Sequence, residues 1–83
     1  MTKWIEELKV AFEKNGDNFN NMVTTLTSEQ LNKSFNKGGP NGEPFTAWGE
    51  KYVYFPVCYD NDEWVGSAPR NPCDEATEHQ GGG

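Results

Sequence analysis

Apolar residues near the start of the chain recur at intervals of three and four, which is the spacing of one face of a helix. The members of this stripe are Trp4, Ile5, Leu8, Ala11 and Phe12. The stripe predicts a helix over residues 3–14, with Thr2 as its cap. Asn15-Gly16 follows directly and supplies a residue that tolerates the left-handed conformation, so the helix is expected to end there.

Two further helices are predicted before residue 37. The first follows Asp17 and rests on helical spacing of Phe19, Met22, Val23 and Leu26, although the asparagines and threonines between them are poor helix formers. The second is marked by Thr27-Ser28-Glu29-Gln30, a capping box in which Thr27 and Gln30 bind each other's main-chain N–H groups. It is expected to run over residues 28–36.

From Phe45 onward the apolar period changes from that of a helix to that of a strand. Strands are predicted over residues 45–48, 51–59 and 63–67. Asp60-Asn61-Asp62 is expected to form the second turn, because Asn and Asp tolerate positive φ. Pro56 lies in the central strand, where a missing N–H is unfavourable. It predicts either a bulge or a pairing that ends near Phe55 on one side.

These elements predict an α+β fold, with two or three short N-terminal helices packed on a three-stranded antiparallel β-meander. A chain of 83 residues is long enough for one domain. We expect that domain over residues 1–73, with a helical part (1–37), a glycine- and proline-rich linker (38–44), the meander (45–67) and an irregular end (68–73). Residues 74–83 are predicted to be a disordered tail rich in acids and glycine.

The alternation in the central strand separates two sets of side chains. Val53, Phe55 and Val57 are expected to pack on the helices, which leaves Tyr52 and Tyr54 on the open face, together with either Trp48 or Trp64. Tyrosine and tryptophan dominate the energetics of protein interfaces. The predicted protein-binding residues are Tyr52, Tyr54, Trp64, Asp60, Asp62 and Glu63. The alternative is that the rings form structural cross-strand pairs with no binding role.

The acidic excess is confined to one half of the chain. Residues 1–37 have five lysines and five acids, whereas residues 38–83 have Lys51 and Arg70 against eight acids, so the net charge of −6 belongs to the second half. Nucleic-acid binding depends on clustered Lys and Arg, so no direct nucleic-acid contact is expected. An acidic surface suits a basic protein partner, although it also serves simple solubility.

Few residues of the chain are candidates for catalysis or metal binding. Asp60, Asp62 and Glu63 lack the distal ligands of a calcium loop, and Cys58, Cys73 and His79 lack the paired spacing of a zinc site. One histidine in the tail does not make an activated thiol plausible. We therefore expect no enzyme, no metal and no cofactor.

Localisation follows from the apolar pattern. No apolar run reaches the length of a membrane span, and acids follow soon after Met1, so no signal peptide is expected. The expectation is a cytoplasmic protein with no membrane partner.

Residues 45–57, followed by Glu63-Trp64-Val65-Gly66-Ser67 and Pro69-Arg70-Asn71-Pro72, resemble small uncharacterised proteins carried by bacteriophages and prophages. The resemblance covers about residues 44–73, and no functional residue transfers through it. It implies a phage or prophage context, in which small acidic accessory proteins commonly bind and block a host protein.

The function expected from these observations is that of a non-enzymatic, acidic, protein-binding accessory factor, such as an inhibitor or modulator of a host protein. One alternative is a structural or assembly component that acts by self-association. Another is a protein without a separable binding site. The sequence leaves the oligomeric state open.

Overall fold

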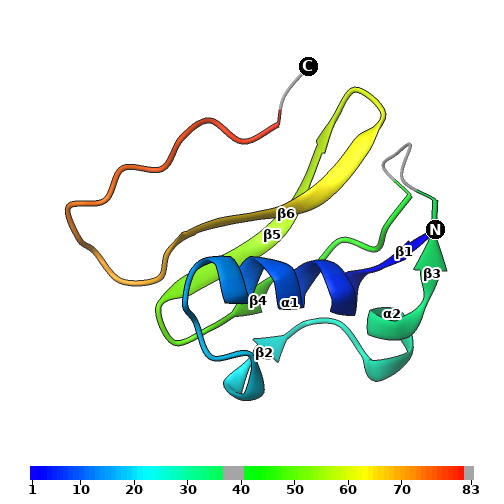
Figure 1. The fold of residues 1–83 in the computed structure, drawn as a ribbon, viewed down its shortest axis with the longest axis horizontal. Helices are drawn as coiled ribbons and strands as arrows, with labels where there is room; N and C mark the ends of the chain where they lie inside the picture. Colours follow the sequence, from blue (N-terminus) through cyan, green and yellow to red (C-terminus); the bar gives the residue numbers. More distant parts are fainter. Residues whose placement is uncertain (37–40, 82–83) are drawn as a thin grey trace.

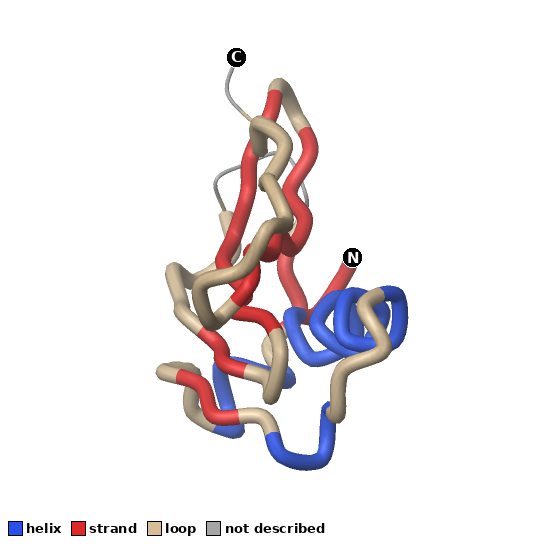
Figure 2. The backbone as a smooth tube through the Cα atoms, turned by 90° about the vertical axis from the view of Figure 1, so that its left-hand side faces the viewer, coloured by secondary structure: helices blue, strands red, loops and turns tan. Residues whose placement is uncertain are grey.

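The computed structural model describes residues 1–36 and 41–81 of the chain, which form an α+β fold (Figure 1). In chain order the elements are β1 (Thr2–Lys3), α1 (Trp4–Lys14), the 3₁₀ turn η1 (Phe19–Asn21), β2 (Val23–Thr24), α2 (Ser28–Asn32), β3 (Ser34–Phe35), β4 (Ala47–Trp48), β5 (Tyr52–Tyr59) and β6 (Asp62–Pro69). The described strands form a two-stranded antiparallel sheet, β1-β3, and a four-stranded antiparallel sheet in the order β2-β4-β5-β6. The long β5–β6 hairpin extends well beyond the short strands (Figure 2).

The first helix is confirmed, although its predicted cap is wrong. α1 spans Trp4–Lys14, and Gly16 has the expected positive φ of 64°. The N-cap position is held by Lys3 and has no side-chain hydrogen bond. Thr2 does not cap the helix because it lies in β1, paired with Phe35, and its hydroxyl donates to Glu7 Oε2 at 3.1 Å.

The predicted second helix is wrong. Its residues form η1 and then β2, whose Val23 pairs with Trp48 of β4. The Asn18 side chain accepts a hydrogen bond from Asn20 N, so it supports a tight turn in place of a helix. The weak helix propensity of this segment is outweighed by strand pairing at the edge of the sheet.

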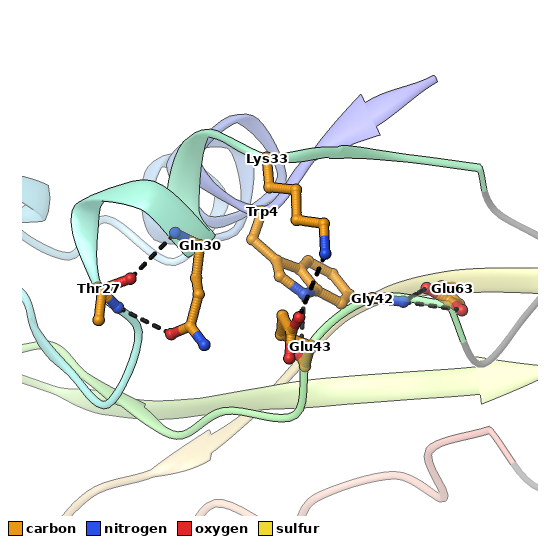
Figure 3. A network of polar contacts seen from close by, with 7 residues as sticks. All are labelled: Trp4, Thr27, Gln30, Lys33, Gly42, Glu43 and Glu63. Carbon is orange, nitrogen blue, oxygen red and sulfur yellow. Dashed lines mark hydrogen bonds and ion pairs between the residues drawn. The ribbon is translucent and has the colours of Figure 1, made fainter.

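The capping box is confirmed. Gln30 N donates to Thr27 Oγ1 at 3.1 Å, and Thr27 N donates to Gln30 Oε1 at 3.0 Å (Figure 3). The helix it begins, α2, ends at Asn32 and not at residue 36 as predicted. The reason is that the next residues form β3 and pair with β1.

Thr27→Ala is expected to lower the free energy of unfolding by about 1 kcal/mol, because the variant leaves the N–H of Gln30 without its partner. Urea denaturation of the variant and the wild type measures this difference. Ser28→Ala is the matched control, since it removes an exposed hydroxyl from the next residue and should change stability by less than about 0.5 kcal/mol. Equal losses in the two variants would contradict a specific role for the cap.

The three predicted strands are confirmed as β4, β5 and β6, but β2 adds a fourth strand that the sequence did not reveal. Pro56 does not create a bulge, because the β5–β6 register is unbroken through the pair Pro56 and Val65. The alternative prediction is confirmed: β4 pairs only with Val53 and Tyr54. Arg70 N donates to Lys51 O, and hydrogen-bonded residues alternate along an antiparallel pair, so the Pro56 nitrogen faces away from β6. On its other side, Pro56 lies beyond the end of β4, so no main-chain hydrogen bond is lost there.

Aromatic contacts join the helices to the sheet. Trp4 lies 4.8 Å from Phe35 and 5.0 Å from Phe45 between ring centroids. Phe12 stacks on Tyr54 at 4.1 Å, with 16° between the ring planes. The buried cluster consists of Trp4, Leu8, Phe12, Leu26, Phe35, Phe45, Ala47 and Tyr54. It lies between α1 and one face of the four-stranded sheet.

The remaining segments connect or end the fold. The predicted linker is described only over residues 41–44, which have no helix or strand, and residues 38–40 lie outside the described part. Ala68 and Pro69, expected to be irregular, belong to β6. Residues 74–81 likewise have no helix or strand and are almost entirely exposed, and their predicted disorder stays a prediction.

Candidate functional site

The prediction of which side of the sheet is open is wrong for Tyr54. Its side chain has 0% exposure, because the ring stacks on Phe12 of α1. Ser67, the strand partner of Tyr54, accepts a hydrogen bond from Asn15 Nδ2, so the same face of β6 also meets α1. Residues in register share a face, and therefore the Tyr54 side is the inner side of the sheet.

Tyr54 satisfies its buried hydroxyl through a carboxylate. The hydroxyl donates to Asp17 Oδ2 at 2.9 Å. Burial, together with the neighbouring Asp17 carboxylate, raises the pKa of Tyr54 far above its usual range, so the hydroxyl remains a donor. This bond allows a tyrosine to lie on the inner side of the sheet, where Val53, Phe55 and Val57 were predicted.

Asp17 also anchors the turn between β4 and β5. Its carboxylate accepts from the main-chain N–H groups of Glu50 (2.9 Å), Lys51 (3.3 Å) and Tyr52 (3.2 Å). A Cβ on Gly49 would collide with this carboxylate, so the turn needs a glycine there. Burial alone raises the pKa of Asp17, but the bonds from Tyr54 and the main chain outweigh burial and lower the pKa below its usual value.

Glu63 is a second correction, because it does not belong to the exposed turn. Its side chain is only 3% exposed and accepts from Gly42 N at 3.0 Å (Figure 3) and also from Asn41 N. The adjoining Glu43 carbonyl accepts from Trp4 Nε1 at 3.0 Å. Glu63 thus holds residues 41–43 against the inner side of β6 and has a structural role.

The other predicted site residues lie nearer the surface. Asp60 and Asp62 flank the exposed end of the β5–β6 hairpin, and Asp60 has the positive φ, 57°, that the turn prediction requires. Asp62 Oδ1 accepts from Glu63 N at 3.0 Å. Tyr52 is half-buried on the inner face, and its hydroxyl donates to Glu75 Oε1 at 2.8 Å. That hydrogen bond is the main reason why the pKa of Tyr52 is raised.

The face opposite α1, which we call the outer face, is largely apolar. Strand register places across it the row Val23, Trp48, Val53 and Ala68, followed by Phe55 with Gly66 and by Val57 with Trp64. Val23 is 63% exposed, whereas Trp48, Val53, Phe55 and Trp64 are half-buried. The structure therefore places Trp64 on the same face as Trp48 and the residues predicted to be core, and on the opposite face from Tyr54.

The end of the C-terminal segment, Gln80 and Gly81, lies against part of this outer face. A Cβ at Gly66 would meet Gln80 Oε1 at 3.1 Å, and one at Gly81 would meet Val57 Cγ1 at 2.6 Å. Figure 1 shows the segment, in orange and red, turning back after β6 and running toward the tip of the β5–β6 hairpin. Val57 is consequently buried although it projects away from the core.

Within residues 1–36 and 41–81, no cluster of three His, Cys, Asp or Glu side chains is suited to a metal ion. Cys58 is half-buried and Cys73 is exposed, and both are free thiols. Among the described helices, none has the length and apolar character of a membrane span.

Comparisons with protein-family models, with curated proteins and with solved structures find no match to this chain. The candidate site therefore depends on geometry alone. Its defining feature is an apolar, tryptophan-containing sheet face beside an acidic hairpin turn.

Proposed function

We propose that this chain is a non-enzymatic protein-binding protein and that its contact surface is the outer face. The observation that carries the proposal is the cross-strand row from Val23 through Trp48 to Val53, which lies on the side of the sheet that α1 does not cover. Side chains of this kind on a sheet surface expose apolar area that a partner protein can bury. Tryptophan contributes disproportionately to the affinity of such contacts.

The charge around this face defines the partner. Asp60 and Asp62 lie at the exposed hairpin turn, and the half of the chain that contains the hairpin has the whole negative excess. Complementary charge accelerates association and selects against acidic partners. The proposed partner is a basic protein surface with apolar side chains, and its binding should weaken as salt is raised.

The biological setting is part of the same proposal. The likeness of residues 44–73 to small phage and prophage proteins supports a host protein as the target, encountered in the cytoplasm. Self-association through the outer face is less favoured, because two copies would bring together net charges of −6. Sedimentation at several protein concentrations distinguishes a monomer from such an assembly.

Two exposed valines provide a matched test. Val23 of the outer face and Val10 of α1 are 63% and 66% exposed, so replacing either by lysine should leave the fold intact. Val23→Lys places a charge in the proposed contact and should reduce binding of a bacterial partner at least about tenfold, the ratio for a loss near 1.4 kcal/mol. Val10→Lys adds the same charge on α1 beside β6, at the opposite edge of the sheet from Val23, and should bind like the wild type.

The measurement is quantitative capture from bacterial lysate, in which proteins retained by the wild type are compared with those retained by each variant. Circular dichroism establishes that both variants are folded. A protein retained equally by the wild type and Val23→Lys would place its contact outside the outer face. The absence of any protein retained by the wild type but lost in Val23→Lys would overturn the proposed function.

A further inference from the structure

We propose that residues 74–81 act as a displaceable cover of the outer face and occupy, within the same chain, the place where a basic extended segment of the partner binds. This inference rests on the proposed function and adds two things to it. It specifies the form of the partner segment as extended, and it makes the chain's own C-terminal segment a competitor for the same surface.

The path of the segment is the first observation. The chain reverses after β6, and Glu75 then accepts the hydrogen bond from Tyr52 at the rim of the sheet. Further on, Gln80 lies against Gly66, and Gly81 lies against Val57 and the Cys58 carbonyl. The end of the segment therefore lies against the part of the outer face formed by Gly66 and Val57, and it reaches this position from the rim of the sheet without forming a helix or a strand.

The fit at the end of the segment is close. Gly81 has a positive φ of 66°, and a Cβ there would lie 2.6 Å from Val57 Cγ1 and 3.0 Å from the Cys58 carbonyl oxygen. Contacts this short are not tolerated, and positive φ disfavours any other residue. The contact with Val57 thus requires glycine at position 81. A substitution there should displace the segment from the outer face without changing the charge of the segment.

The C-terminal segment is bound only weakly to the outer face. Residues 74–80 are exposed along their whole length, and they form no strand with β6. The segment contains Asp74, Glu75 and Glu78, so it places negative charge beside an already acidic hairpin. Like charges in proximity oppose the closed arrangement, whereas a basic segment on the same face would be attracted.

Three chains test the cover itself: the wild type, a chain ending at Cys73, and Gly81→Val, with Ala76→Val as the matched control for added volume in the tail. The first readout is the ¹H–¹⁵N spectrum, followed at Val57 and Gly66. The chain ending at Cys73 and Gly81→Val should shift these two amide signals and increase binding of the dye ANS, while Ala76→Val should resemble the wild type. Unchanged amide signals of Val57 and Gly66 in both altered chains would contradict the proposal that the segment covers the outer face. If the shortened chain fails to fold, the signals of Gly81→Val alone provide the test.

The second readout is binding of a synthetic peptide, Lys-Val-Lys-Phe-Lys-Val, with its lysines replaced by glutamate in a control peptide. If the face is covered nine-tenths of the time, removing the cover should strengthen binding of the basic peptide about tenfold. Equal binding of the basic peptide to the wild type and to the shortened chain would overturn the competition and leave the proposed function standing. A failure of both chains to bind it, with Val57 and Gly66 shifted as expected, would contradict the basic partner and retain the cover.

Discussion

Tyr54→Ala should destabilise the protein by about 3–5 kcal/mol, the range for deleting a buried aromatic ring. The ring has no exposure and stacks on Phe12 in the centre of the cluster between α1 and the sheet. A domain of this size has a total stability of about 4–12 kcal/mol, so the variant should be partly or wholly unfolded at 37 °C. Thermal unfolding followed by circular dichroism measures the effect.

Two variants separate the causes of this loss. Tyr54→Phe keeps the ring stack and removes only the bond to Asp17, so it should lose about 1.5–3 kcal/mol, as expected for a hydrogen bond to a charged group. Tyr59→Ala is the same truncation at an exposed tyrosine of the same strand and should change stability by less than about 0.5 kcal/mol. A Tyr54→Ala protein as stable as Tyr59→Ala would contradict the burial of Tyr54 and restore the open-face assignment.

Asp17→Asn should be the second severe change, with a loss of about 2–4 kcal/mol, since hydrogen bonds to a charged group contribute about 1.5–3 kcal/mol each and are not additive. The carboxylate accepts from the Tyr54 hydroxyl and from the main-chain N–H groups of the β4–β5 turn. The amide group of asparagine has two N–H donors. Some of the donors that now bind the Asp17 carboxylate would therefore face an N–H group in place of an oxygen. Urea denaturation at neutral pH measures the difference.

The same residue should give the protein a defined acid dependence. The pKa of Asp17 is lowered in the folded state, so its contribution to stability is fully present above the unfolded-state value near 3.8 and is lost as pH falls through the folded-state pKa. The stability difference between the wild type and Asp17→Asn should therefore be constant above about pH 5 and shrink below pH 4. Asp60→Asn, in the exposed turn, is the control and should follow the wild-type profile. A difference that does not change with pH would contradict the role of the ionised carboxylate.

Local signals in the sequence predicted local structure well. The Thr27–Gln30 box begins α2, the apolar stripe forms α1, and the Asp60-Asn61 turn joins β5 to β6 as expected. Predictions were wrong where a distant strand competed with a weak local preference. Val23–Thr24 left the helical pattern to pair with β4, and Ser34–Phe35 shortened α2 by pairing with β1.

The candidate site was predictable only in part. Strand alternation separated Tyr52 and Tyr54 from Val53, Phe55 and Val57, and this separation is confirmed. The assignment of these two sets to the inner and outer sides is reversed, because stacking on Phe12 and the hydrogen bond to Asp17 make a tyrosine suitable for burial. Trp64 does lie on the outer face, whereas Glu63 is drawn inward by the N–H groups of residues 41 and 42.

The amino-acid sequence by itself determined the period of each segment, the ends marked by glycine and capping side chains, and the confinement of negative charge to the second half of the chain. These properties depend on neighbouring residues alone. The tertiary structure decided which side of the sheet meets α1, because that choice depends on long-range partners: Phe12 for the Tyr54 ring, Asp17 for its hydroxyl, and residues 41 and 42 for the Glu63 carboxylate. A buried polar group needs such a partner, and the partner's position is a property of the fold.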